Sequence, residues 1–164
     1  MLNYSFYKLE HKVIITSQEN DAYNMTKSIA DATPEQRQSM LTDRLKMISS
    51  QPEEQRVQSV KGIVIGMSKL DEKRRSVFQC ALAEALSEQT EEERHAIFIG
   101  RARAASLVSK EVDISIYQGI VNEVYNWPED RRHKIIGGLE KAYDALNLTK
   151  PDFPSMLENA KAAA

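Results

Sequence analysis

Residues able to bind a metal ion occur in this sequence, but not at the spacing that metal sites need. The three histidines, His11, His95 and His133, have no second His or Cys at a ligand spacing such as H-x-x-x-H or C-x-x-C. Glu92 and His95 form an E-x-x-H pair, yet both lie at the polar start of a helical pattern, whereas carboxylate-bridged metal centres use inward-facing ligands. We therefore expect no metal site.

Candidates for covalent or acid–base catalysis are equally few. The sequence has no G-x-G-x-x-G or G-x-x-x-x-G-K-[ST] phosphate loop, and no two carboxylates share an apolar helical face where burial would perturb their pKa values. Cys80 is the single cysteine, and it lies in an apolar stretch at a position where a helical repeat has small residues. This placement predicts a buried, inert thiol. We expect neither catalytic residues nor a bound cofactor.

Composition narrows the remaining classes of protein. The chain has 164 residues, a length typical of one domain, and its formal net charge of −2 gives no argument for nucleic-acid binding. No apolar run approaches the ~18–20 residues of a membrane span, and residues 1–16 lack the basic start and long apolar centre of a secretory signal. A lone cysteine suits a reducing compartment. We expect one cytoplasmic domain, residues 1–164, with no membrane span.

The elements that would position any site come from a repeat of 18–19 residues. The clearest unit begins Thr33-Pro34-Glu35-Gln36-Arg37, in which threonine can cap a helix, proline suits its first position and glutamine can complete a capping box. Apolar residues recur 4, 8 and 11 positions after the origin of each unit, which is one face of an α-helix. The origins are Arg37, Arg56, Arg74, Arg94, Asp113 and Arg131. We expect the arginines to keep their guanidinium groups in water.

The predicted fold is all-α. Six or seven helices joined by links of two or three residues would be antiparallel neighbours, and two units would make a helical hairpin of about 37 residues. The array covers residues 17–146, and both a short α-solenoid and an up-and-down bundle satisfy its apolar pattern. Glycine recurs six positions after the origin, at Gly62, Gly100, Gly119 and Gly137. Close packing of neighbouring helices explains this best, and a ligand groove lined by these glycines is the alternative.

The two ends of the chain differ from the repeat. Residues 1–16 form an aromatic N-terminal arm, whose β-branched Val13-Ile14-Ile15 run predicts an extended segment that packs across the helices or pairs with another chain. Residues 147–164 form a tail in which Pro151 and Pro154 end the last long helix. Ser155 can then cap a short helix that continues through Ala160.

These observations favour a non-catalytic protein-interaction or structural protein, such as an adaptor or an accessory subunit of a larger assembly whose partner is another protein. Packing explains the regular features, and extended helical arrays bind partners through a continuous face. The candidate partner-binding residues are Tyr4, Phe6 and Tyr7 on the arm, together with Arg101 and Arg103, which have no acidic neighbours in sequence. The alternatives are a helical protein that binds a small ligand or cofactor, and a helical repeat that binds nucleic acid, which the net charge disfavours.

Overall fold

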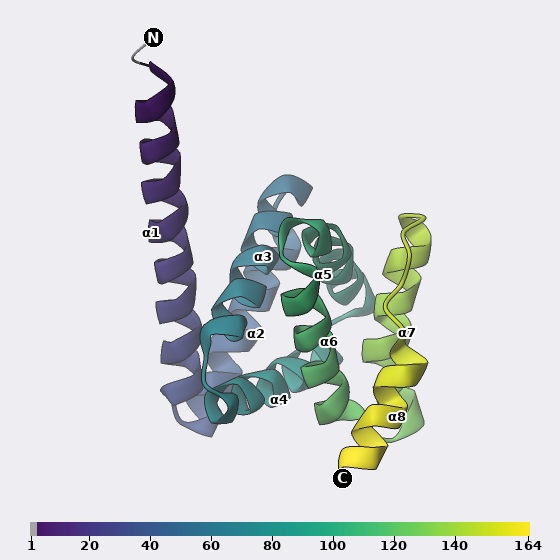
Figure 1. Ribbon diagram of the computed structural model, residues 1–164. Helices are drawn as coiled ribbons and strands as arrows, with labels where there is room; N and C mark the ends of the chain where they lie inside the picture. Colours follow the sequence, from purple (N-terminus) through teal and green to yellow (C-terminus); the bar gives the residue numbers. More distant parts are fainter. Residues whose placement is uncertain (1–2) are drawn as a thin grey trace.

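The computed structural model describes the backbone of residues 3–164 and the side chains of residues 17–164. Over this range the chain forms eight α-helices, one turn of 3₁₀ helix and no strand (Figure 1). The elements are α1 (Asn3–Asp31), α2 (Pro34–Ser50), α3 (Glu53–Lys69), α4 (Glu72–Glu88), α5 (Glu91–Ala104), η1 (Ala105–Leu107), α6 (Lys110–Val124), α7 (Glu129–Ala145) and α8 (Phe153–Ala163). The prediction of an all-α fold is confirmed.

Alternate helices pack side by side, and this arranges the helices in two layers. The odd-numbered helices α1, α3, α5 and α7 follow one another in one layer, and α2, α4, α6 and α8 do so in the other. Consecutive helices run up and down and also touch, but their contacts are less extensive. The principal neighbour of each helix is therefore the helix two units away, rather than its partner in a hairpin.

The helix starts are evenly spaced. The residues that cap α2 to α7 at their N-termini follow one another at intervals of 19 residues: Thr33, Pro52, Asp71, Thr90, Ser109 and Pro128. The equivalent origins are then Arg37, Arg56, Arg75, Arg94, Asp113 and Arg132. Two predicted origins, Arg74 and Arg131, are thus one residue early. Each has a second arginine next to it, and α4 and α7 bury two adjacent apolar stripes, so the sequence pattern there fits either register.

The apolar face predicted from the spacing is the buried face of the helices. Every residue predicted four positions after an origin is at most 5% exposed: Leu41, Val60, Phe78, Phe98, Tyr117 and Ile135. The residues predicted at the eighth position are also all buried: Leu45, Val64, Leu82, Ala102, Val121 and Leu139. At the eleventh position Ala105 is the exception: it is half-buried, because α5 ends one residue earlier and Ala105 lies in the 3₁₀ turn that follows.

Four of the repeated arginines turn back onto the preceding helix, whereas the sequence predicts guanidinium groups that extend into water. Arg37 donates hydrogen bonds from Nη2 to the carbonyl oxygens of Ala30 (3.0 Å) and Ala32 (2.8 Å) at the end of α1. These carbonyls have no partner within their own helix, and a cation there also complements the negative end of the helix dipole. Equivalent bonds to the preceding helix end are made by Arg56, Arg94 and Arg132.

The repeated glycines make room for side chains of the helix two units earlier. In the 19-residue register the glycines six positions after an origin are Gly62, Gly100, Gly119 and Gly138. Each faces the residue forty positions earlier in the chain: Ala22, Val60, Gln79 and Phe98, respectively. At Gly138, for example, an added Cβ would lie 2.7 Å from the Phe98 ring. These contacts support the packing interpretation, with side chains rather than backbones occupying the space.

Gly66→Ala and Gly62→Ala form a matched pair of tests within α3. A Cβ at Gly66 would lie 2.6 Å from Thr26 and 2.7 Å from the carbonyl oxygen of Ala22, so the backbones must separate, whereas a Cβ at Gly62 meets the Ala22 methyl at an ordinary 3.8 Å. Alanine is otherwise favoured over glycine inside a helix. We expect Gly62→Ala to raise the free energy of unfolding by about 0.5–1 kcal/mol and Gly66→Ala to lower it by about 1–2 kcal/mol. Urea unfolding followed by circular dichroism measures both, and equal effects would contradict this packing.

Residues 3–16 are helical, so the prediction of an extended N-terminal arm is wrong. They form the first half of α1, which in Figure 1 runs well past the ends of the neighbouring helices. The β-branched run favours a strand locally, but a single strand leaves its backbone hydrogen-bonding groups without partners. A helix satisfies these groups internally, and it extends from residues 17–31 at little cost because the helix is already nucleated there.

The C-terminal tail contains the predicted short helix, with different ends. The chain leaves α7 through Asn147, whose positive φ of 53° is typical of a residue just after a helix. The cap of α8 is Asp152, which accepts a hydrogen bond from the backbone N–H of Ser155 at 3.1 Å. Ser155 is thus in the first turn rather than the cap, and the helix continues beyond Ala160.

Candidate functional site

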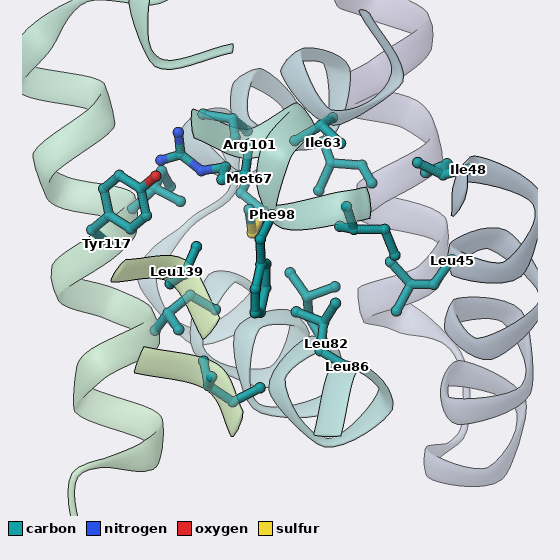
Figure 2. Close-up of a pocket in the computed structure, with 16 residues that line it drawn as sticks. Leu45, Ile48, Ile63, Met67, Leu82, Leu86, Phe98, Arg101, Tyr117 and Leu139 are labelled. Carbon is teal, nitrogen blue, oxygen red and sulfur yellow. The ribbon is translucent and has the colours of Figure 1, made fainter. Parts of the chain in front are cut away.

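A small apolar cavity lies in the interior, enclosed by helices of both layers. Its volume is about 60 Å³, and α2 to α7 all contribute side chains to its wall (Figure 2). Among the described residues, Arg101 and Tyr117 are the only polar or charged side chains that line it, and no glycine does. The volume is well below the ~150 Å³ of a cavity that holds benzene, and further below the ~300–1,000 Å³ of a typical ligand site. The cavity therefore does not supply the glycine-lined ligand groove that was the alternative interpretation.

A buried polar cluster joins α5, α6 and α7 at one side of this cavity. Arg101 is 8% exposed, and its Nη1 lies 2.6 Å from Oδ1 of Asp113 in an ion pair that lacks hydrogen-bond alignment. The guanidinium carbon lies 3.9 Å from the centre of the Tyr117 ring, as a cation–π contact. The hydroxyl groups of Tyr117 and Tyr143 share a hydrogen bond of 2.8 Å. The ion pair links the last turn of α5 to the first turn of α6.

The tyrosines of this cluster are held in their protonated form. Burial is the largest cause, and it raises the pKa of both Tyr117 and Tyr143 above the usual value. A neutral phenol is a poor nucleophile and a poor base, and the carboxylate of the cluster, Asp113, is paired with Arg101. Its geometry supports a structural link between helices, which Phe153 of α8 extends by packing edge-on against Tyr117 with ring centres 5.6 Å apart.

The predicted partner-binding residues do not form one surface. Arg101 is buried against Asp113, whereas Arg103 is half-exposed and its Nε lies 2.5 Å from Glu53 of α3. Both arginines thus have acidic partners, which come from other helices. The aromatic residues predicted on the arm, Tyr4, Phe6 and Tyr7, belong to α1, but their side chains lie outside the described residues. A role of these five residues in partner binding stays a prediction.

Two grooves open to solvent along the layer of even-numbered helices. The first, of about 550 Å³, lies between α2 and α4, and the second, of about 800 Å³, lies between α4 and α6. The carboxylates that line them are Glu35, Asp43 and Glu84 in the first groove and Glu72, Glu111 and Glu123 in the second. Arg75 is the only basic residue among the lining residues. We call the surface formed by these two grooves the acidic face.

The two grooves of the acidic face adjoin along α4, which contributes Glu84 to the first groove and Glu72, Ser76 and Gln79 to the second. The Cys80 thiol of α4 is affected by the charges of Glu84 and Glu123, and also by those of Arg131 and Arg37. Glu123 is itself positioned by a hydrogen bond of 2.8 Å from the hydroxyl of Ser76, which bridges α6 to α4. The even-numbered helices that form this face alternate along the sequence with the odd-numbered helices. In addition, the positive and negative charges of the whole chain nearly cancel. This is why the sequence pattern alone did not reveal the acidic face.

Cys80 is exposed, which corrects the prediction of a buried thiol. The error follows from the register of α4: in the 19-residue spacing the small residue of this unit is Ala81, which is 8% exposed. The thiol therefore lies on the outer surface of α4 between the two grooves.

The pH dependence of thiol labelling tests the environment of Cys80 that the structure describes. Partial desolvation is the largest cause that raises the thiol's pKa above its usual 9.0. The carboxylates of Glu123 and Glu84 add to it, and the guanidinium groups of Arg131 and Arg37 lower it by less. The thiolate is the form that attacks a maleimide, so at near-neutral pH the folded protein should react more slowly than the protein in urea. The midpoint of the pH–rate profile should be higher in the folded state. A midpoint equal to or below that in urea would contradict the described environment.

Within the part of the chain that the structure describes, no three or more His, Cys, Asp or Glu side chains are grouped so that they could hold a metal ion. No described helix combines the length and hydropathy that crossing a bilayer requires. The chain matches no family model, and no curated protein or solved structure is similar enough to count as a match.

Proposed function

We propose that this protein is a non-catalytic interaction or structural protein, an adaptor or an accessory subunit of a larger assembly. The acidic face is the observation that supports this most strongly. It offers two adjacent grooves of about 550 and 800 Å³, each walled by helices and open to solvent. Grooves between helices are a recurring place for a segment of a partner protein to bind. The buried polar cluster, by contrast, has its tyrosines protonated and its arginine paired, which favours a structural role.

We further propose that the helices form a short α-solenoid rather than a closed bundle. Each helix packs mainly on the helix two units earlier, and the starts of α2 to α7 are 19 residues apart. Stacking of this kind presents one continuous face per layer, which is how helical arrays bind extended partners. A cytoplasmic location is part of the proposal, because an exposed lone thiol such as Cys80 suits a reducing compartment.

The proposal is tested by the state of the protein in its own cells. Extract prepared without denaturant is separated by size, and the fractions that contain this chain are captured and analysed by quantitative mass spectrometry. We expect the chain to elute well above its 18.6 kDa monomer mass, together with another protein in near-stoichiometric amount. Elution as a free monomer, with no protein enriched over a mock capture after mild cross-linking, would overturn the proposal.

A further inference from the structure

We infer that the acidic face binds a lysine- and arginine-rich polypeptide segment of the partner protein. This inference rests on the proposed function and adds the chemistry of the partner. Three features of the molecule support it: the charge of the two grooves, the polar floor of the larger groove and the contrast with a third groove elsewhere on the surface.

The charge of the acidic face is a local property. Six carboxylates and one guanidinium line its two grooves, although the whole chain has a net charge of only −2. The groove between α1, α2 and α3 provides the contrast, because it is lined by Glu19 and Asp21 together with Arg44 and Lys61. Like charges grouped along one face attract a partner of opposite charge and repel others, which gives specificity and speeds association.

The floor of the larger groove offers a hydrogen-bond acceptor that the fold holds in place. Gln79 is 3% exposed, and its Nε2 donates to the carbonyl oxygen of Ile116 at 3.2 Å. This bond uses Nε2, and no hydrogen bond to Oε1 occurs among the residues whose side chains are described. Gly119 makes room for the amide, because a Cβ there would collide with Gln79. An amide oxygen in the groove wall beside carboxylates suits a donor such as a guanidinium, an ammonium or a peptide N–H group.

Other cationic or polymeric ligands fit the acidic face less well. Nucleic acid is excluded by charge, because its phosphates would meet carboxylates. A single metal ion needs several ligands at one point, and no such group occurs among the described residues. The carboxylates are instead distributed over three helices, with Glu35 on α2, Glu84 on α4 and Glu111 on α6. Such a distribution matches positive charges that are spread along a polypeptide.

A defined peptide tests the inference directly. The probe is a fluorescent peptide of alternating alanine with lysine and arginine, and its matched control has glutamate in place of each basic residue. Fluorescence anisotropy with the full-length protein should show binding of the basic probe only, and the binding should weaken as salt is added. Failure of the basic probe to bind at low ionic strength would overturn the inference.

Two sets of substitutions locate the binding. The triple variant Glu84→Gln, Glu111→Gln and Glu123→Gln should bind the basic probe about tenfold more weakly, from the loss of three charge pairs of modest strength. The control variant changes three exposed carboxylates at the starts of odd-numbered helices: Glu54→Gln, Glu92→Gln and Glu129→Gln. It makes the same change in net charge and should alter affinity less than about twofold. Equal losses in the two variants would overturn the inference, because attraction would then be unspecific.

A third variant covers the case in which the triple variant does not fold. Cys80→Lys adds one positive charge at an exposed position between the two grooves and removes no packing from the core. It should weaken binding of the basic probe by about two- to fivefold. Unchanged affinity in a variant with wild-type circular dichroism would contradict the proposed location.

The unique thiol separates failure of this inference from failure of the proposed function. Benzophenone attached to Cys80 is cross-linked to the captured partner by light, and the joined peptides are sequenced. The label should join to a segment rich in lysine and arginine. A partner that is captured but joined through a neutral or acidic segment overturns the inference and leaves the proposed function intact. Absence of any partner overturns the proposed function, and the peptide probe then decides whether the acidic face binds basic segments.

Discussion

Asp113→Ala is expected to lower the free energy of unfolding by about 3–5 kcal/mol. The side chains of Arg101 and Asp113 are 9% and 14% exposed, and their atoms Nη1 and Oδ1 lie 2.6 Å apart. Removing the carboxylate leaves the guanidinium in the wall of an apolar cavity, without a counter-charge and largely out of water. An uncompensated buried charge is one of the most costly single defects a core can have.

The exposed pair between Arg103 and Glu53 is the control for this prediction. These side chains are 47% and 53% exposed, so Glu53→Ala should cost at most about 1 kcal/mol. The double variant Arg101→Met, Asp113→Leu should recover most of the loss, because apolar side chains of similar size replace both charges. Urea unfolding measures the free energy of unfolding of all three variants. The values can be compared when the dependence of this free energy on urea concentration is the same in each variant. A loss in Asp113→Ala no larger than in Glu53→Ala would show that the buried pair is not important for stability.

Phe98→Ala should also cost about 3–5 kcal/mol, for an apolar reason. Phe98 is 2% exposed, lines the interior cavity and packs against the space left by Gly138 (Figure 2). Its ring joins α5 to α7, and truncation would enlarge a cavity that already measures about 60 Å³. The surrounding helices are held by their own contacts, so we expect little collapse and a cost at the upper end of this range.

Benzene gives a second measurement of the same variant. An apolar cavity of ~150 Å³ stays dry and binds benzene, so saturating benzene should raise the melting temperature of Phe98→Ala and leave that of the wild type unchanged. Ile97→Ala is the matched control, since Ile97 is a buried neighbour in the same cavity wall and has no ring against Gly138. If benzene has no effect on Phe98→Ala, the site has collapsed and the helices are less rigid than the packing indicates.

The functional surface was harder to predict than the fold. Arg101 and Arg103 have no acidic residue near them in sequence, but their partners Asp113 and Glu53 come from other helices. The acidic face was missed for a related reason: Glu84 and Glu123 belong to different units, and only the packing of α4 against α6 brings them together near Cys80.

Local interactions explain what the sequence by itself determined about this protein. The caps at Thr33 and Thr90 start helices by hydrogen bonds to residues three positions away, and the apolar phase of each unit selects its buried face. Both signals lie within one helix, so they can be recognised without knowing its neighbours. The all-α class, the spacing of the helix starts to within one residue and the core residues of the repeat follow from them.

Only the tertiary structure decided the interactions between units. Gly138 of α7 packs against Phe98 of α5, forty residues earlier, and Arg101 of α5 forms an ion pair with Asp113 of α6. Residues 3–16 are helical, because the described part of the chain contains no strand with which an extended segment could pair. Each of these outcomes depends on which helices lie side by side. The apolar pattern of a single helix does not specify that arrangement, because the same face can be buried against either neighbour.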